Sequence, residues 1–311
     1  MSNFSRYILC SSDEVELADY IIYYILWFTL LFSLLGLCAN TLSYVTIRSM
    51  NVSNSSIVYL LALSIWDSLS LIFDGPIDVG QMLTSYTFPG LYLQKFDEMN
   101  DWVTTTVANW MVVAISLDRF IAVYLPHTYQ STFSKPQTAK KIVIGLVIFI
   151  YLTNGSLVFL TYGQCEASSC SLLPKWENSG ILEILIFYQG IAPNIFVVLF
   201  NALISIKLIL YKKSSKIKQI NQSKKNGIEF LLFVVSFSFI FFNSTTQVSW
   251  YMRYNAYAGG NKCTVIYQIV EFLESLAPVV NNGGNFFLYI LLGKTFRKSF
   301  IKYISCRQSS F

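Results

Sequence analysis

The chain has 311 residues, of which 54% are hydrophobic and only 13% charged, and its net charge is +5. Soluble globular domains average about 25% charged residues, so this composition excludes an ordinary soluble domain, and the large apolar content excludes a disordered chain. The single histidine, His127, argues against a zinc enzyme or a catalytic triad, and no glycine-rich phosphate loop is present. We therefore expect no enzyme activity.

Seven apolar segments follow one another along the chain, each long enough for a helix that crosses a bilayer, which takes about 20 residues. They cover residues 20–47, 57–83, 96–124, 142–162, 181–211, 228–252 and 265–292. Polar residues interrupt several of them, as expected for helices that line the interior of a bundle. The pattern predicts an all-α membrane protein, with a polar tail over residues 1–19 and a bundle of seven transmembrane helices over residues 20–292.

The Lys and Arg residues are unevenly divided between the segments that join these helices. With the amino terminus outside, the outer segments carry five of the 22 and the inner segments carry 17. Because positive charges concentrate on the cytoplasmic side, we predict an extracellular amino terminus and a multi-pass protein of the plasma membrane. We expect membrane lipid among its partners and no nucleic acid.

Both ends of the chain contain candidate modification sites. Asn3, in Asn3-Phe4-Ser5, is an extracellular glycosylation acceptor. Residues 293–311 mix apolar and basic side chains, which predicts a short amphipathic eighth helix and a cytoplasmic tail. Cys306 follows the amphipathic stretch and is a candidate for palmitoylation, with an unmodified thiol as the equal alternative.

Motifs in the spans resemble those of rhodopsin-like (class A) G-protein-coupled receptors. The third span ends in Asp118-Arg119-Phe120, similar to that family's Asp-Arg-Tyr, and the seventh contains Asn285-Phe286-Phe287-Leu288-Tyr289, similar to its Asn-Pro-x-x-Tyr. Further similarities lie in other spans, at Asn40, Asp67 and Pro193. The phenylalanine in the seventh-span motif most resembles invertebrate FMRFamide-type neuropeptide receptors.

The resemblance implies two functional clusters. The first is the switch for a heterotrimeric G protein, at Asp118, Arg119, Asn285 and Tyr289. The second is a polar core that holds a sodium ion in the family, at Asn40, Asp67, Asn281 and Asn285. A carboxylate within a membrane is costly, which independently marks Asp67 as functional. A hydrogen-bonded core without sodium is the equal alternative, because Ala108 stands where the family often has a serine; we expect no other cofactor.

The chain departs from the family in its cysteines and in its sixth span. The family cysteine at the outer end of the third span falls at Gln94. Three pairings are open to the four outer cysteines, of which we expect Cys165 with Cys170 and Cys10 with Cys263. Asn243 and Thr245 replace the tryptophan and proline of the sixth span, so a divergent chemosensory or signalling-silent receptor is one alternative.

Acidic residues concentrate on the predicted outer side. The outer segments carry 14 of the 17 and the inner segments two, which gives net charges of −9 outside and +15 inside. A negative mouth attracts cationic ligands. Asp97 and Asp101 lie one turn apart on the third span, facing a second group at helical spacing on the seventh. The predicted ligand-binding residues are Asp97, Asp101, Glu271, Glu274 and Tyr267.

Together these features predict a receptor that binds a small cationic extracellular ligand, an amidated neuropeptide, and activates a heterotrimeric G protein. A biogenic-amine receptor is an alternative, since Asp101 matches the amine-binding carboxylate of the aminergic branch. A salt bridge across the bundle, for example to Arg253, is the structural alternative for Asp101. A seven-helix transporter or channel is more remote, because no internal repeat is found.

Overall fold

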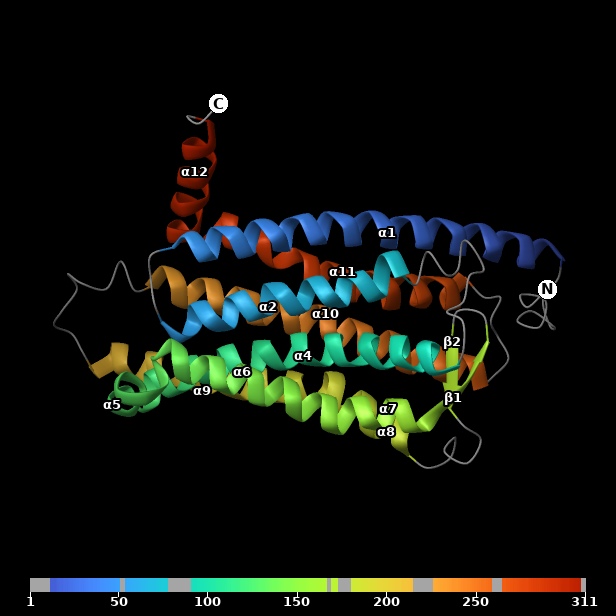
Figure 1. The fold of residues 1–311 in the computed structure, drawn as a ribbon, viewed down its shortest axis with the longest axis horizontal. Helices are drawn as coiled ribbons and strands as arrows, with labels where there is room; N and C mark the ends of the chain where they lie inside the picture. The colour runs from blue at the N-terminus through green and yellow to red at the C-terminus, as the bar shows by residue number, and fades with distance from the viewer. Residues whose placement is uncertain are drawn as a thin grey trace.

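The computed structural model describes residues 12–50, 54–77, 91–166, 169–172, 180–214, 226–258 and 265–308. Within this part of the chain, seven long helical segments run side by side along the long axis of the molecule (Figure 1). They are α1 (Ser12–Ser49); α2 (Ser55–Ile72) with η2 (Phe73–Ile77); α4 (Leu91–Tyr124); α6 (Pro136–Ile150) with η4 (Tyr151–Gly155) and α7 (Ser156–Thr161); α8 (Ile181–Ile186) with η6 (Phe187–Ile191) and α9 (Ala192–Ser214); α10 (Asn226–Ala258); and α11 (Val265–Leu292).

Smaller elements distinguish the two ends of the bundle. The predicted amphipathic helix is present as α12 (Lys294–Gln308), which projects away from the bundle beside the end of α11 (Figure 1). The short α5 (Pro126–Thr128) and η3 (Tyr129–Phe133) lie at this same end, between α4 and α6. An antiparallel hairpin of β1 (Tyr162–Glu166) and β2 (Ser169–Leu172) lies at the opposite end. We call these ends the α12 end and the hairpin end.

The predicted all-α membrane bundle is confirmed, and the hairpin is an addition to it. Its strands have five and four residues, too few to show a period-two pattern in the sequence. Five helical segments whose side chains are described are long and apolar enough to cross a membrane: Tyr23–Ser49, Ser55–Ile77, Lys95–Tyr124, Pro136–Thr161 and Glu183–Leu210. The chain is therefore a multi-pass membrane protein.

Helix α4 forms the centre of the bundle. Val103, Val107 and Met111 are fully buried and lie four residues apart, on one face of the helix. They belong to a core cluster that includes buried residues of α2, α6, α9 and α10, among them Leu63 and Phe239. Side chains on α4 are therefore placed to contact most of the other helices, which makes α4 the natural carrier of a site inside the bundle.

In the described part of the chain, short π-helical segments occur in three of the spans. In η6, Pro193 follows the segment and lacks an N–H, so the carbonyl of Gln189 four residues earlier loses its helical donor. In η2, Pro76 lies within the segment itself. The third segment, η4, contains no proline. Each π-turn frees backbone carbonyls inside the membrane, and these must find other donors.

Helices α1 and α11 cross at close range. A Cβ atom built on Gly283 would lie 2.9 Å from the Cα of Gly36, so glycine on both helices allows the backbones to touch. A Cβ on Gly36 would in turn lie 2.7 Å from a methyl group of Leu71 on α2. Gly36 and Gly283 therefore set the distance between α1 and α11.

We expect the Gly283→Leu variant to lower the stability of the folded protein by about 2 kcal/mol, because a new side chain forces the two backbones apart. This corresponds to a fall of about 5 °C in the melting temperature of the purified protein. Gly284→Leu is the matched control, since a Cβ on Gly284 meets nothing within 4 Å. Equal melting temperatures for the two variants would contradict the close crossing.

Candidate functional site

At the α12 end, the carboxylate of Asp118 is enclosed by three hydroxyl donors from two elements, α2 and η3. It is only 4% exposed. Ser55 and Ser56, at the first turn of α2, donate to its two oxygens at 2.7 and 3.2 Å, and the Tyr129 hydroxyl of η3 donates at 3.4 Å. Asn54 caps this end of α2 and so positions the two serines. Asp118 thereby ties α4 to α2 and η3.

Arg119 folds back onto the same cluster. Its guanidinium lies 3.7 Å from the carboxylate of Asp118 and donates a hydrogen bond to the hydroxyl of Ser56. The side chain is 23% exposed at the surface of the bundle. The structure therefore brings Asp118 and Arg119 together as an ion pair at the α12 end.

The predicted polar core is built around Asp67, which is 2% exposed. Asn285 of α11 donates its amide to Asp67 at 2.8 Å. Asn40 and Asn281 bond instead to a residue that was not predicted, Asn282: Asn40 donates to its backbone carbonyl at 2.9 Å, and Asn281 to its side-chain oxygen at 3.3 Å. Asn282 therefore links α1 to α11 through the bond from Asn40.

Tyr289 lies one turn beyond Asn285 on α11 and is also buried. Its ring packs against Phe296 of α12 at 5.4 Å between centroids. Its hydroxyl is enclosed and has no hydrogen-bond partner in the described part of the chain. The fourth predicted switch residue is therefore a hydroxyl held inside the bundle between the polar core and α12.

The sodium ion that the resemblance implied at Asp67 stays a prediction. A hard cation is held by several oxygen ligands, as calcium is by six to eight. Here Asn285 presents its N–H to the carboxylate, Ala108 offers no side-chain oxygen, and the amide nitrogens of Asn40 and Asn281 are bonded to Asn282. Of these residues only Asn40 has a buried oxygen without a partner. These contacts form hydrogen bonds among α1, α2 and α11, and the choice between a core with sodium and one without it stays open.

A ladder of polar side chains leads from Asn282 toward the hairpin end. Asn282 donates to the hydroxyl of Ser70 at 2.9 Å. The Ser70 hydroxyl lies 2.8 Å from an oxygen of Asp74 and 2.8 Å from the hydroxyl of Thr105. Asp74 in turn lies beside Asp101 on α4, close enough for a hydrogen bond when one of the two carboxyl groups carries a proton. The predicted ligand residue Asp101 is therefore connected to the polar core through groups on α2, η2 and α11.

Asp74 is a site residue that the sequence analysis counted only among the outer acidic residues. It lies in η2, beside Gly75, where any Cβ would collide with Ser33 of α1. Because Gly75 has no side chain, η2 can pack directly against α1. Pro76 is the next residue of η2. The available signal was a carboxylate next to a Gly-Pro pair inside an apolar span.

The other predicted ligand residues are placed as follows. Asp97 lies one turn from Asp101 toward the hairpin end and is half-buried, and Glu274 is half-buried on α11. Between the two aspartates, Glu98 accepts a hydrogen bond from the Trp102 indole at 2.9 Å. Tyr267 and Glu271 lie on α11, but their side chains are outside the described part of the structure.

A further polar cluster, which we call the α9–α10 clasp, surrounds Asn243, at the position where rhodopsin-like receptors have a tryptophan. Asn243 of α10 donates to the carbonyl of Gly190 at 3.2 Å and to the side chain of Asn194 at 3.1 Å. Asn194 donates to the hydroxyl of Ser244 at 3.2 Å. Any Cβ on Gly190 would collide with Gln247, so the glycine lets α10 approach η6 directly. The clasp consists of Gly190, Asn194, Asn243 and Ser244.

Two further side chains complete the bonding of η6. Asn109 of α4 donates to the carbonyl of Gln189 at 2.9 Å, and the indole of Trp110 donates to the carbonyl of Tyr188 at 3.0 Å. The carbonyl that Pro193 leaves without a helical donor is therefore satisfied by Asn109. Helix α4 and helix α10 each bond to the same π-helical turn from different sides.

The modification and disulfide candidates are only partly placed. The strand register sets the backbones of Cys165 and Cys170 directly opposite each other in the hairpin, which is the arrangement a cross-strand pairing requires. The side chains of both, and that of Cys306, are outside the described part, as are Asn3, Cys10 and Cys263 altogether. These pairings and modifications stay predictions.

Most of the chain is similar to known proteins. The model of the seven-transmembrane receptor family named for rhodopsin matches residues 40–281. A curated relative from Drosophila melanogaster, the neuropeptide CCHamide-1 receptor, is 23% identical over 291 residues, covering 86% of this chain. The chain spans only 56% of the length of that relative. The matched region contains Asp101, the Asp118–Arg119 pair and the α9–α10 clasp, and it includes Asn40, Asp67 and Asn281 of the polar core but ends before Asn282 and Asn285.

Proposed function

Because the chain belongs to the rhodopsin family of seven-transmembrane receptors, we propose that it is a plasma-membrane receptor for a cationic extracellular neuropeptide with an amidated end. In this proposal the amino terminus and the hairpin end are extracellular, and the α12 end contacts a heterotrimeric G protein. Proteins of this family are generally signalling receptors and not enzymes. The match also favours a receptor over the transporter or channel alternative.

The placement of Asp101 carries the proposal. It is a half-buried carboxyl group on the central helix, and one of its oxygens is shielded from solvent. A guanidinium or ammonium group that reaches such a carboxyl forms a charge-assisted hydrogen bond in surroundings of low dielectric, where it is stronger than in water. The relative's printed name supports a neuropeptide as the ligand class.

Binding at Asp101 would act on the rest of the bundle through the polar ladder. A cation that draws Asp101 away from Asp74 changes the bonding of Ser70, and through it the position of Asn282 between α1 and α11. The ligand shifts the population only if it binds one arrangement of these groups more tightly than the other. We take the conformation in which Asp118 holds Arg119 as the resting one.

A ligand screen tests the function directly. The full-length receptor is expressed in cultured cells and exposed to amidated neuropeptides and to biogenic amines, with calcium and cyclic-nucleotide readouts. We expect responses to amidated peptides that carry a basic residue. A response to amines alone would replace the peptide proposal by the amine alternative, and silence toward every class, with confirmed surface expression, would favour the signalling-silent alternative.

We expect Asp118→Asn to raise signalling in the absence of ligand by about fivefold. The substitution keeps the size of the side chain and one oxygen that accepts from the serines of α2, but it removes the charge that attracts Arg119. Partly exposed ion pairs contribute about 1 kcal/mol, which sets the size of the effect. The measurement is basal second-messenger level normalised to surface expression, and an unchanged basal level would contradict the proposed resting role.

A further inference from the structure

The side chain of Gln247 has an amide oxygen that accepts no hydrogen bond inside the bundle. Gln247 lies on α10, one turn from Asn243 toward the hairpin end, and it is partly buried. Its oxygen Oε1 is enclosed and has no hydrogen-bond partner in the described part of the chain. A buried amide oxygen without a donor costs free energy, so this group needs an explanation that the contacts of the clasp do not supply.

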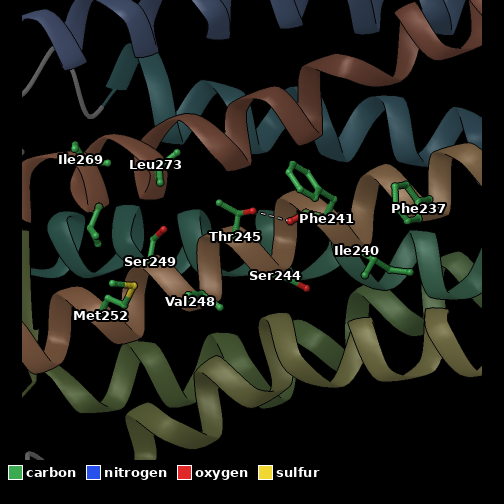
Figure 2. Close-up of a pocket in the computed structure, with 11 residues that line it drawn as sticks. Phe237, Ile240, Phe241, Ser244, Thr245, Val248, Ser249, Met252, Ile269 and Leu273 are labelled. Carbon is green, nitrogen blue, oxygen red and sulfur yellow. Dashed lines mark hydrogen bonds between the residues drawn. The ribbon is translucent and has the colours of Figure 1, made fainter. Parts of the chain in front are cut away.

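The amide of Gln247 points toward η6. It packs against Gly190 and fills the space that a Cβ atom on this glycine would need. A separate groove lies between α10 and α11, as Figure 2 shows, and it is lined by Phe241, Thr245 and Val248 among others but not by Gln247. The oxygen without a donor therefore lies on the side of α10 that faces the clasp.

The depth of Gln247 in the bundle relates it to the predicted ligand residue Asp101. Asn109 of α4 and Asn243 of α10 donate to carbonyls of η6 that are adjacent in sequence, so these two residues lie at the same depth. Asp101 is about two turns, or about 12 Å, from Asn109 toward the hairpin end. Gln247 is about one turn, or about 6 Å, from Asn243 in the same direction. Measured from the hairpin end, Gln247 therefore lies about 6 Å deeper than Asp101.

The chemistry of the glutamine amide selects among the groups that a peptide can present at this depth. A carboxamide has an oxygen that accepts and an NH2 group that donates, so two carboxamides can pair through two hydrogen bonds. A peptide with an amidated end carries such a group. A free carboxyl terminus is ionised and only accepts, so it offers no donor to Oε1 of Gln247 and brings an uncompensated charge into the bundle.

We propose that Gln247 binds the terminal carboxamide of the peptide and thereby selects amidated peptides over peptides that end in a free acid. This inference rests on the proposed function, and it adds the residue that recognises the amidated end. The terminal NH2 group donates to Oε1 of Gln247 while the basic side chain of the peptide pairs with Asp101. A depth difference of about 6 Å corresponds to about two residues of extended chain, so the basic residue is expected next to the last one.

Two peptide libraries test this recognition. Each contains tetrapeptides with arginine next to the last residue and varied residues elsewhere, and the libraries differ only in ending in a carboxamide or in a free carboxyl group. Both are applied to cells that express the full-length receptor, with calcium and cyclic-nucleotide readouts. We expect the amidated library to act at concentrations about 30-fold lower, the effect of two hydrogen bonds between neutral groups. Equal potency of the two libraries would overturn the proposal.

The Gln247→Leu variant removes both hydrogen-bonding groups from a side chain of similar size. On this variant we expect the amidated library to lose about 30-fold in potency and the free-acid library to change by less than about threefold, so that the preference for the amide disappears. Thr246→Val is the matched control, because Thr246 is the preceding residue of α10 and its hydroxyl bonds only within its own helix, to the carbonyl of Phe242. This control should keep the full preference for the amide.

A preference for the amide that survives in Gln247→Leu, at normal surface expression, would overturn amide recognition by Gln247 while the proposed function stands. Equal potency losses for both libraries on this variant would show an effect on α10 as a whole and would overturn the recognition as well. If neither library acts on the unmodified receptor at any concentration, the peptide proposal itself fails, and this inference fails with it.

Discussion

The Asp101→Asn receptor is expected to reach the cell surface normally but to need about 100-fold more of a cationic peptide for half-maximal response. Asparagine keeps the shape and much of the hydrogen bonding of the side chain and removes only its charge. Removing one partner of an enclosed charge pair costs about 2–5 kcal/mol, because the other charge is then left without compensation, and 2.7 kcal/mol corresponds to 100-fold. The measurement is a dose–response curve normalised to surface expression.

Glu183→Gln is the matched control for this prediction. Glu183 lies on α8 at the same end of the bundle, but its side chain is exposed. A charge at an exposed rim changes the rate of encounter and its salt dependence much more than the affinity, so we expect a potency change below about threefold. Equal potency losses in the two variants would show a general effect of the negatively charged outer side. An unchanged dose–response curve for Asp101→Asn would show that Asp101 does not contact the ligand.

The bundle itself was predictable from the sequence, because a span of about 20 apolar residues has few other stable arrangements in a membrane. The π-helical segments were not predicted, since one extra residue in a turn hardly alters the hydrophobic pattern of a helix that is apolar on most sides. Pro76 and Pro193 mark two of the segments in retrospect, but η4 has no such marker. The hairpin strands were too short to show alternation.

The candidate site was predictable in its residue types more than in its connections. Asp67 and Asn285 do form the expected bond, because both motifs sit at matching depths in their helices. The role of Asn282 was missed. The rotation of α11 about its own axis decides whether Asn281 or Asn282 faces α1 and α2. That rotation is set by packing between helices and cannot be derived from the sequence of one helix. Asp74 was missed because its importance comes from Asp101, on another helix.

The Asn243→Leu receptor is expected to signal without ligand at about tenfold the unmodified basal level. Asn243 makes two hydrogen bonds across the α9–α10 clasp, and each such bond contributes about 1 kcal/mol. In the conformation described here these bonds coexist with Arg119 held at Asp118. Leucine has a similar volume and no donor, so the variant weakens only the conformation that contains the clasp, and the population moves away from it.

Thr245→Val is the matched control, because it lies two residues away on α10 and loses only a bond within its own helix, to the carbonyl of Phe241. Its basal level should equal that of the unmodified receptor. The comparison also separates two readings of the missing proline at this position. If α10 still moves on activation, the clasp takes the role of the tryptophan and proline that the family has in its sixth span, and Asn243→Leu raises basal signalling. If both variants are silent while both reach the surface, α10 does not move on activation and the signalling-silent alternative stands.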